Sequence, residues 1–227
     1  MPKNHTNNAR SVNLETARIY TNYYEVVFIK DNVTQSAVAG EGAEQIEINI
    51  AEGVYTILLA AGCKSTLVAP LLLASGYVEG VSITAGDNVV EITLRPIAVE
   101  ITAPAEVIQN KTFAVRVDID TKNPYITLAT LPLCFNTSNN RINSSDFTNS
   151  GNNYTWTYEV NAPPTIGANV VFISQTFNAI PKSSWYIGYY TSSASHFENI
   201  RDYYRKTVSV VQEDDLPKVN IVVEWRD

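Results

Sequence analysis

The chain has 227 residues and a formal net charge of −7 at neutral pH. This length allows one large or two small domains, each with a buried core. Negative charge of this size repels a phosphate backbone, so we do not expect nucleic acid as a partner.

The composition favours β-structure. Val, Ile, Thr and Tyr dominate the apolar runs, and blocks of helix-forming residues at the helical period are nearly absent. We therefore predict an all-β protein of two small antiparallel β-sandwich domains, immunoglobulin-like or prealbumin-like, with one short helix in the second. Because an alternating run ends at Pro96 and a new β pattern follows it, the expected divisions are a disordered leader (1–15), a first sandwich (16–97) and a second sandwich (98–227).

The first sandwich is predicted around a hairpin. Ile46, Ile48 and Ile50 alternate with polar residues, Gly53 allows a corner, and a second apolar run follows at 54–61. Strands at 18–30 and 34–39 precede this hairpin. An edge or bulged strand at 67–74 follows it, interrupted by Pro70, and then a second hairpin of 78–84 and 89–94 across a turn at 85–88.

The second sandwich is predicted from shorter patterns. Strands are expected at 99–104, 113–120, 125–135, 154–160, 169–177 and 185–190, with a terminal hairpin of 208–212 and 219–225. The polar tract 136–153 is expected to be a long loop. Ser195 and Glu198 match a capping box, which predicts a helix at 196–205.

Neither cysteine usage nor apolar runs fix the cellular compartment. Cys63 and Cys134 could form one disulfide, but two buried free thiols are favoured. The polar first ten residues hold no apolar core of a signal peptide, and the longest apolar run, 67–74, is too short to cross a bilayer. We expect an extracytoplasmic protein, at the cell surface or in the periplasm, whose signal peptide is absent from this sequence and which has no transmembrane segment.

Candidate catalytic and metal-binding groups are sparse. His196 lies near Ser192 and Ser193, but nucleophilic catalysis there needs an orienting carboxylate that the sequence does not place. Asp118 and Asp120 share one strand face and could join Asp146, Asp214 and Asp215 around calcium, yet the spacing matches no calcium loop. A solvated strand face is favoured, and glycine-rich phosphate loops are absent. We expect no metal, no cofactor and no enzymatic activity.

Aromatic residues offer one candidate ligand site. Tyr154, Trp156 and Tyr158 alternate with polar residues and are predicted to face the core. Trp185 and Ile187 share one face of a later strand, and Tyr186 and Tyr190 lie on the other. That second face is either a platform on which a sugar ring can stack or the buried side of a strand that is covered on both faces.

Two turns in the first sandwich carry a family resemblance. The corner Gly53-Val54-Tyr55 and the later turn Gly86-Asp87-Asn88 are similar to those in repeats of bacterial surface proteins with a prealbumin-like or immunoglobulin-like sandwich. In those repeats the first corner opens a core strand and the second opens the last strand. The resemblance covers residues 17–97, and it implies contacts with other surface proteins or cell-surface glycans.

Three functions remain as hypotheses. The leading one is a non-enzymatic bacterial surface module for adhesion or structural assembly, whose faces and edge strands meet other proteins. The second is a carbohydrate-binding module that uses Tyr186 and Tyr190. The third is an enzyme with an unrecognised site.

Overall fold

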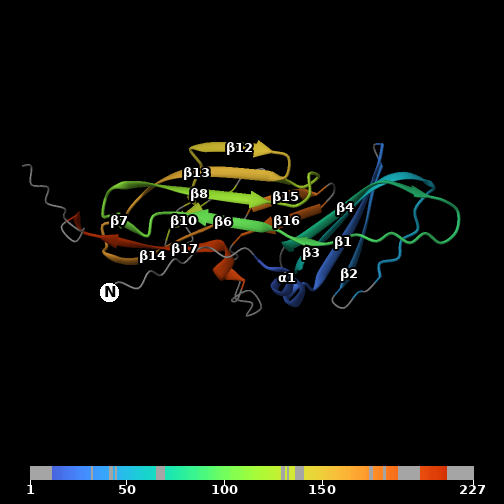
Figure 1. The fold of residues 1–227 in the computed structure, drawn as a ribbon, viewed down its shortest axis with the longest axis horizontal. Coiled ribbons are helices and arrows are strands. Elements are labelled where there is room, and N and C mark those ends of the chain that lie inside the picture. Colours follow the sequence, from blue (N-terminus) through green and yellow to red (C-terminus); the bar gives the residue numbers. More distant parts are fainter. Residues whose placement is uncertain are drawn as a thin grey trace, which may run out of the picture.

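The protein has an all-β fold, as predicted. A computed structural model describes residues 12–31, 33–40, 43, 45–64, 70–128, 131, 133–135, 141–173, 176–180, 183–188 and 200–213. Within these residues the strands form three sheets with sandwich-like packing, accompanied by one short α-helix. Figure 1 shows an elongated molecule with β1 to β4 gathered at one end.

Sheet A joins strands from distant parts of the chain. Its order is β2-β1-β3-β4-β16-β15-β9, and β5 pairs with β4 beside this path. Neighbouring strands are antiparallel except β4 and β16, which are parallel and pair at Leu71 and Tyr186. The strands are β1 (Tyr23–Lys30), β2 (Val33–Gly40), β3 (Gly53–Cys63), β4 (Leu71–Ile83), β5 (Arg95–Pro96), β9 (Thr127–Leu128), β15 (Thr176–Ile180) and β16 (Ser183–Ile187).

Sheets B and C form the layers of the other end. Sheet B has the order β12-β13-β8-β6, and sheet C has the order β11-β10-β14-β17-β7. Sheet B contains β6 (Ala98–Thr102), β8 (Thr112–Asp120), β12 (Asp146–Ser150) and β13 (Asn153–Asn161). Sheet C contains β7 (Glu106–Ile108), β10 (Leu133–Phe135), β11 (Arg141–Ile142), β14 (Gly167–Ile173) and β17 (Arg205–Val211).

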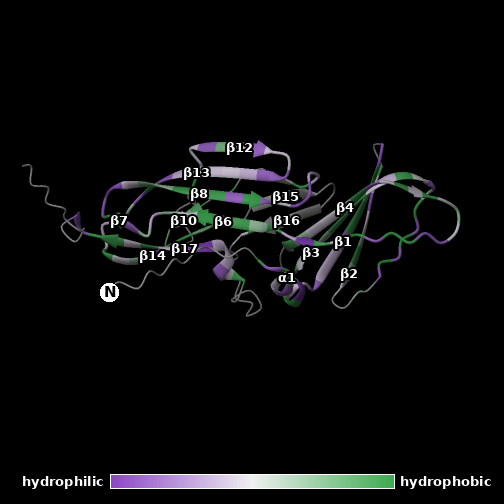
Figure 2. Ribbon diagram, in the orientation of Figure 1, coloured by the Kyte–Doolittle hydropathy of each residue, from purple (hydrophilic) through white to green (hydrophobic). Residues whose placement is uncertain are grey.

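The alternating patterns of β8 and β13 place their apolar side chains in the core. Figure 2 shows hydrophobic and hydrophilic residues alternating along β8. On β13, Tyr154, Trp156 and Tyr158 are all buried, which confirms the predicted core face. The Tyr158 hydroxyl donates a hydrogen bond to the Leu131 carbonyl oxygen. Burial raises the pKa of Tyr158, so this hydroxyl stays protonated and keeps donating.

A helix precedes the first strand, where the sequence predicted a strand from residue 18. Helix α1 (Leu14–Tyr20) begins at Asn13, whose side-chain oxygen accepts a hydrogen bond of 2.7 Å from the Thr16 amide. This cap and the acidic Glu15 in the first turn stabilise a helix start. Buried Ala17 then joins the main core. The predicted strand was therefore wrong in its first part, and β1 begins at Tyr23.

The helix predicted at 196–205 falls largely outside the described residues. Of its range, 200–205 are described, and Arg201–Tyr204 form a 3-10 turn. Residues 1–11, the larger part of the predicted leader, and the last predicted strand at 219–225 also lie outside the described residues. Within the described part of the chain, no helix has the length and apolarity needed to cross a membrane.

Two predicted strands are extended segments without a ladder. Residues 46–50 and 89–94 alternate between half-buried and exposed positions but pair with no described strand, so both predicted hairpins were wrong in one arm. Ile46, Ile48 and Ile92 instead pack onto a small second core on one face of sheet A, formed by Val26, Phe28, Tyr55, Ile57 and Ile83. The segment 89–94 also approaches β4 closely at Gly76, where an added Cβ atom would lie 2.4 Å from the Thr93 carbonyl oxygen.

The polar tract 136–153 also differs from its prediction as a loop. It contains β11 and β12, and β12 pairs with β13 from Asp146 opposite Thr157 to Ser150 opposite Asn153. Phe147 is the apolar anchor of β12, because its ring centroid lies 5.2 Å from that of Trp156 and 6.3 Å from that of Tyr154.

The predicted domain boundary at 97 falls between β5 and β6. Strands from both sides of it share sheet A, and one hydrophobic core contains residues from both sides. Polar contacts also cross it: the Ser75 hydroxyl donates to the Thr121 carbonyl oxygen at 2.6 Å. The division into two domains remains a prediction, but the two parts are extensively joined.

A buried hydrogen bond links two strands of sheet A that lie far apart in the sequence, β1 and β16. The Trp185 indole N–H donates to a Glu25 carboxylate oxygen at 2.9 Å, and these side chains are 0% and 4% exposed. A buried carboxylate is costly in free energy unless it accepts hydrogen bonds. The Trp185 indole N–H is a buried donor to the Glu25 carboxylate on β1 and so lowers this cost. Burial, and next the charge of Glu25, raise the pKa of neighbouring Tyr23.

Both cysteines are buried and neither is in a disulfide, which is the state that the sequence favoured.

Candidate binding surfaces

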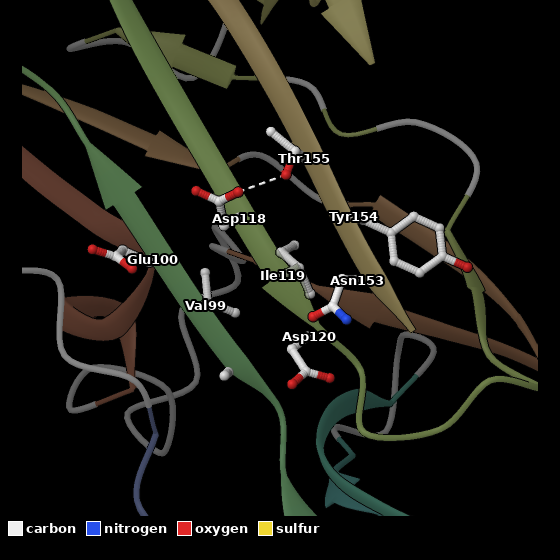
Figure 3. Close-up of a pocket in the computed structure, with 9 residues that line it drawn as sticks. Val99, Glu100, Asp118, Ile119, Asp120, Asn153, Tyr154 and Thr155 are labelled. Carbon is white, nitrogen blue, oxygen red and sulfur yellow. Dashed lines mark hydrogen bonds between the residues drawn. The ribbon is translucent and has the colours of Figure 1, made fainter. Parts of the chain in front are cut away.

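The outer face of sheet B is polar and carries the predicted acidic pair. Antiparallel pairing aligns Glu100 of β6, Asp118 of β8 and Thr155 of β13 in one row across the sheet. Ala98, Asp120 and Asn153 form the next row. These rows line a shallow cleft of about 190 Å³, open to solvent. Figure 3 shows Asp118 turned toward Thr155, and Glu100 on the neighbouring strand.

Asp118 is held by its neighbours. The Arg116 guanidinium donates two hydrogen bonds of 2.7 Å to its two carboxylate oxygens, and the Thr155 hydroxyl donates a third at 2.6 Å. The Arg116 hydrogen bonds are the main reason that the pKa of Asp118 is lowered, and Thr155 adds to them against partial desolvation. The carboxylate is therefore ionised at neutral pH.

Asp120 has a separate set of donors. Its carboxylate accepts from the Lys122 backbone amide at 2.9 Å, and also from the Lys122 ammonium and the Asn152 side-chain amide. Partial burial opposes ionisation of Asp120, but these hydrogen bonds together outweigh it and lower the pKa. Lys122 itself has a positive φ of 59°, in the left-handed region.

The two aspartates of this face are held by hydrogen bonds from the protein itself. Each carboxylate accepts three of them, which makes it a weaker base and a weaker cation ligand. Asp146 lies on β12 beyond the intervening strand β13, and Asp214 and Asp215 lie outside the described residues. Among the residues that the structure describes, no three His, Cys, Asp or Glu side chains come together in a way that could hold a metal ion.

The residues predicted to bind a sugar are only partly described. Tyr186 lies on β16 between β15 and β4, opposite Phe177 and Leu71, and its side chain is outside the described part of the chain, as is the whole of Tyr190. Trp185 and Ile187 are fully buried, as expected for the core face of β16, and Gly188 is buried as well. The platform at Tyr186 and Tyr190 stays a prediction. His196, Ser192 and Ser193 also lie outside the described residues.

A feature that the sequence did not reveal is the contrast among the edge strands. Most strands at the ends of the sheets are short or charged. Strands β9 and β11 have two residues each and β7 has three. Strands β6 and β12 have five each, with Glu100 on β6 and Asp146 on β12. Short length and charge are both ways in which proteins keep edge strands from pairing with other chains.

Strand β2 lacks these protections. It has eight residues, Val-Thr-Gln-Ser-Ala-Val-Ala-Gly, with neither a charge nor a proline. It pairs with β1 without a bulge, from Val33 opposite Lys30 to Gly40 opposite Tyr23. Among the described strands β2 is the last at its end of sheet A, and Val33 and Val38 are 63% and 60% exposed. The edge is thus long, regular, neutral and partly apolar.

The chain was compared with known proteins at the levels of sequence family, curated relatives and solved structures. No family model, curated protein or solved structure matches it.

Proposed function

We propose that this protein is a non-enzymatic module for adhesion or structural assembly at the outer surface of a bacterial cell, and that it contacts other proteins through edge strand β2. The observation that carries the proposal is the eight-residue neutral edge of β2. An unpaired strand edge presents a row of backbone N–H and C=O groups, to which another strand can add by main-chain hydrogen bonds. The extracytoplasmic location rests on the resemblance of residues 17–97 to surface-protein repeats.

The polar face of sheet B supports a binding or structural role over an enzymatic one. General acid–base chemistry needs a group poised to exchange a proton near neutral pH. The pKa values of Asp118 and Asp120 are instead lowered by hydrogen bonds from Arg116 and Lys122. These aspartates stabilise the sheet surface in their ionised form.

Light scattering across a dilution series tests the assembly proposal. Over about three decades of concentration, we expect the average mass of the wild-type protein to rise with concentration. Val38→Lys places a charge on the exposed face of β2 and should hold the mass at that of a monomer. Thr148→Lys puts the same charge on β12, which is exposed but short, and should behave as wild type. A wild-type protein that stays monomeric at every concentration would overturn the proposal.

A further inference from the structure

We propose that the strand added to β2 is β2 of a second copy of this chain, paired antiparallel about a two-fold axis at Ser36. The two sheets A then become one continuous sheet across the dimer. This inference rests on the proposed function, because it names the partner of the same edge.

Symmetry restricts how two β2 strands can pair. A two-fold axis that makes two copies of one edge strand antiparallel stands normal to the sheet, so each face of one copy continues into the same face of the other. Residues directly opposite each other then lie on the same face, so their residue numbers differ by an even number. Only registers centred on a residue satisfy this rule, and those centred on Ser36 or Ala37 each overlap seven residues of β2.

The side chains of β2 favour the register centred on Ser36. There, Val33 lies opposite the second copy's Ala39, and Gln35 lies opposite its Ala37, so a larger side chain meets a smaller one on that face. On the other face Thr34 lies opposite Val38 of the second copy, a β-branched pair of the kind that stabilises adjacent strands. Centring on Ala37 instead places Thr34 opposite Gly40 and Gln35 opposite Ala39, which loses the β-branched pair.

Charge also points to the same strand as partner. Two copies of a chain with net charge −7 repel each other, so their contact is least costly where neither contributes a charge. Strand β2 has no charged residue, whereas β6, β7 and β12 each carry a carboxylate at the edge of their sheets. Pairing β2 with itself therefore places no carboxylate in the new ladder.

The dimer is expected to be weak and to dissociate on dilution. Seven paired residues at one edge form a smaller contact than the roughly 1,600 Å² of a standard protein interface. Affinity comes from main-chain hydrogen bonds and from partial cover of exposed Val33 and Val38.

A charge-swap experiment at Ser36 tests this partner directly. Ser36 is exposed and lies at the proposed axis, so each substitution meets its own copy across the dimer. Ser36→Lys alone and Ser36→Glu alone should each weaken dimerisation by at least about tenfold, because like charges meet in register. An equimolar mixture of the two variants should recover dimers, measured by sedimentation velocity. Ser36→Thr should dimerise as wild type, and circular dichroism and thermal melting should show that all three variants fold.

The outcomes separate the partner from the proposed function. Recovery of dimers in the mixture, but in neither variant alone, supports β2 pairing with β2. If wild type associates and both variants lose association, yet the mixture stays monomeric, the two-fold pairing is wrong while β2 remains a binding edge. Association that is unaffected by either charge also overturns the pairing. A wild-type protein that is monomeric throughout overturns both proposals.

Discussion

Strands β2 and β12 both end a sheet and both are solvent-facing, yet they differ in length and in charge, two properties that govern pairing with another chain. β12 has five residues and carries Asp146, and Phe147 anchors it by packing on the aromatic rings of β13. β2 has eight residues and no charge, and a continuous ladder holds it to β1. The comparison indicates that exposure alone does not make an edge available for pairing, since length and charge also matter.

The strands next to the two edges, β1 and β13, also differ in their buried contacts. β1, the neighbour of β2, carries buried Glu25, whose carboxylate accepts a hydrogen bond from the Trp185 indole N–H on β16. β13, the neighbour of β12, is anchored by Trp156 and Tyr158, both fully buried. Behind β2, the apolar packing of β1 is therefore combined with a buried polar contact between distant segments, whereas the buried side chains named on β13 behind β12 are aromatic.

The largest expected effect comes from breaking that polar contact. Trp185→Phe removes the indole N–H and part of the buried ring, and it leaves the Glu25 carboxylate without this donor. We expect the free energy of unfolding to fall by about 3 kcal/mol, measured by urea denaturation.

Glu25→Gln is the matched control for this change, because an amide oxygen still accepts the Trp185 hydrogen bond without a charge. Its loss of stability should be clearly smaller than that of Trp185→Phe. Equal losses in the two variants would show that the hydrogen bond does not carry the contact between the two segments.

The second effect detaches the protected edge. Phe147→Ala removes the ring that packs β12 against Tyr154 and Trp156. Phe147 is 45% exposed, so the substitution loses only the buried part of its apolar area. We expect a loss of about 1.5 kcal/mol in urea denaturation. Phe147→Tyr keeps the ring and should stay near wild type. If Phe147→Ala costs nothing, β12 is held by its backbone ladder alone.

The third effect is a pH dependence confined to the polar face of sheet B. The pKa of Asp118 is lowered in the folded state, so its contribution to stability is complete above its ordinary pKa of 3.8 and is lost as pH falls through the lowered value. Asp118→Asn should therefore be less stable than wild type at pH 7, and the difference should shrink below about pH 4. Denaturation at both pH values measures this, and a difference that grows in acid contradicts the assignment.

The smallest effect sharpens the comparison of the edges. Asp146→Ser removes the charge from β12 but leaves its five-residue length. We expect no new self-association by light scattering, because a short edge offers few hydrogen bonds to a partner strand. New concentration-dependent association in this variant would mean that the charge of Asp146 alone, and not the short length of β12, prevents β12 from pairing with another chain.

Local pattern in the sequence predicted the core strands well. The alternation of Phe113, Val115, Val117 and Ile119 gave β8 to within one residue, and that of Tyr154, Trp156 and Tyr158 gave β13. The same alternation at Ile46, Ile48 and Ile50 belongs to a segment without a ladder, since the pattern reports which face is buried and not which backbone groups are bonded. Strand β12 escaped prediction because Phe147 is its only apolar residue.

The candidate surfaces, too, were predictable from local sequence only in part. The shared face of Asp118 and Asp120 follows from their two-residue spacing on a strand, which local sequence contains. Their donors Thr155 and Asn152 come from β13 and its turn, and no local rule aligns those positions. The edge position of β2 depends on the order of strands in sheet A, including the pairing of β4 with β16, and sequence distance hides that order.

Amide hydrogen exchange, followed residue by residue at low and at high protein concentration, tests the central claim most directly. If β2 is an open edge that pairs with another strand, alternate amides of 33–40 should exchange fast in dilute solution and slow markedly at high concentration. The amides of β12 should exchange at the same rates in both samples. Protection of β2 that does not change with concentration, or a change that falls on β12 instead, would contradict the account.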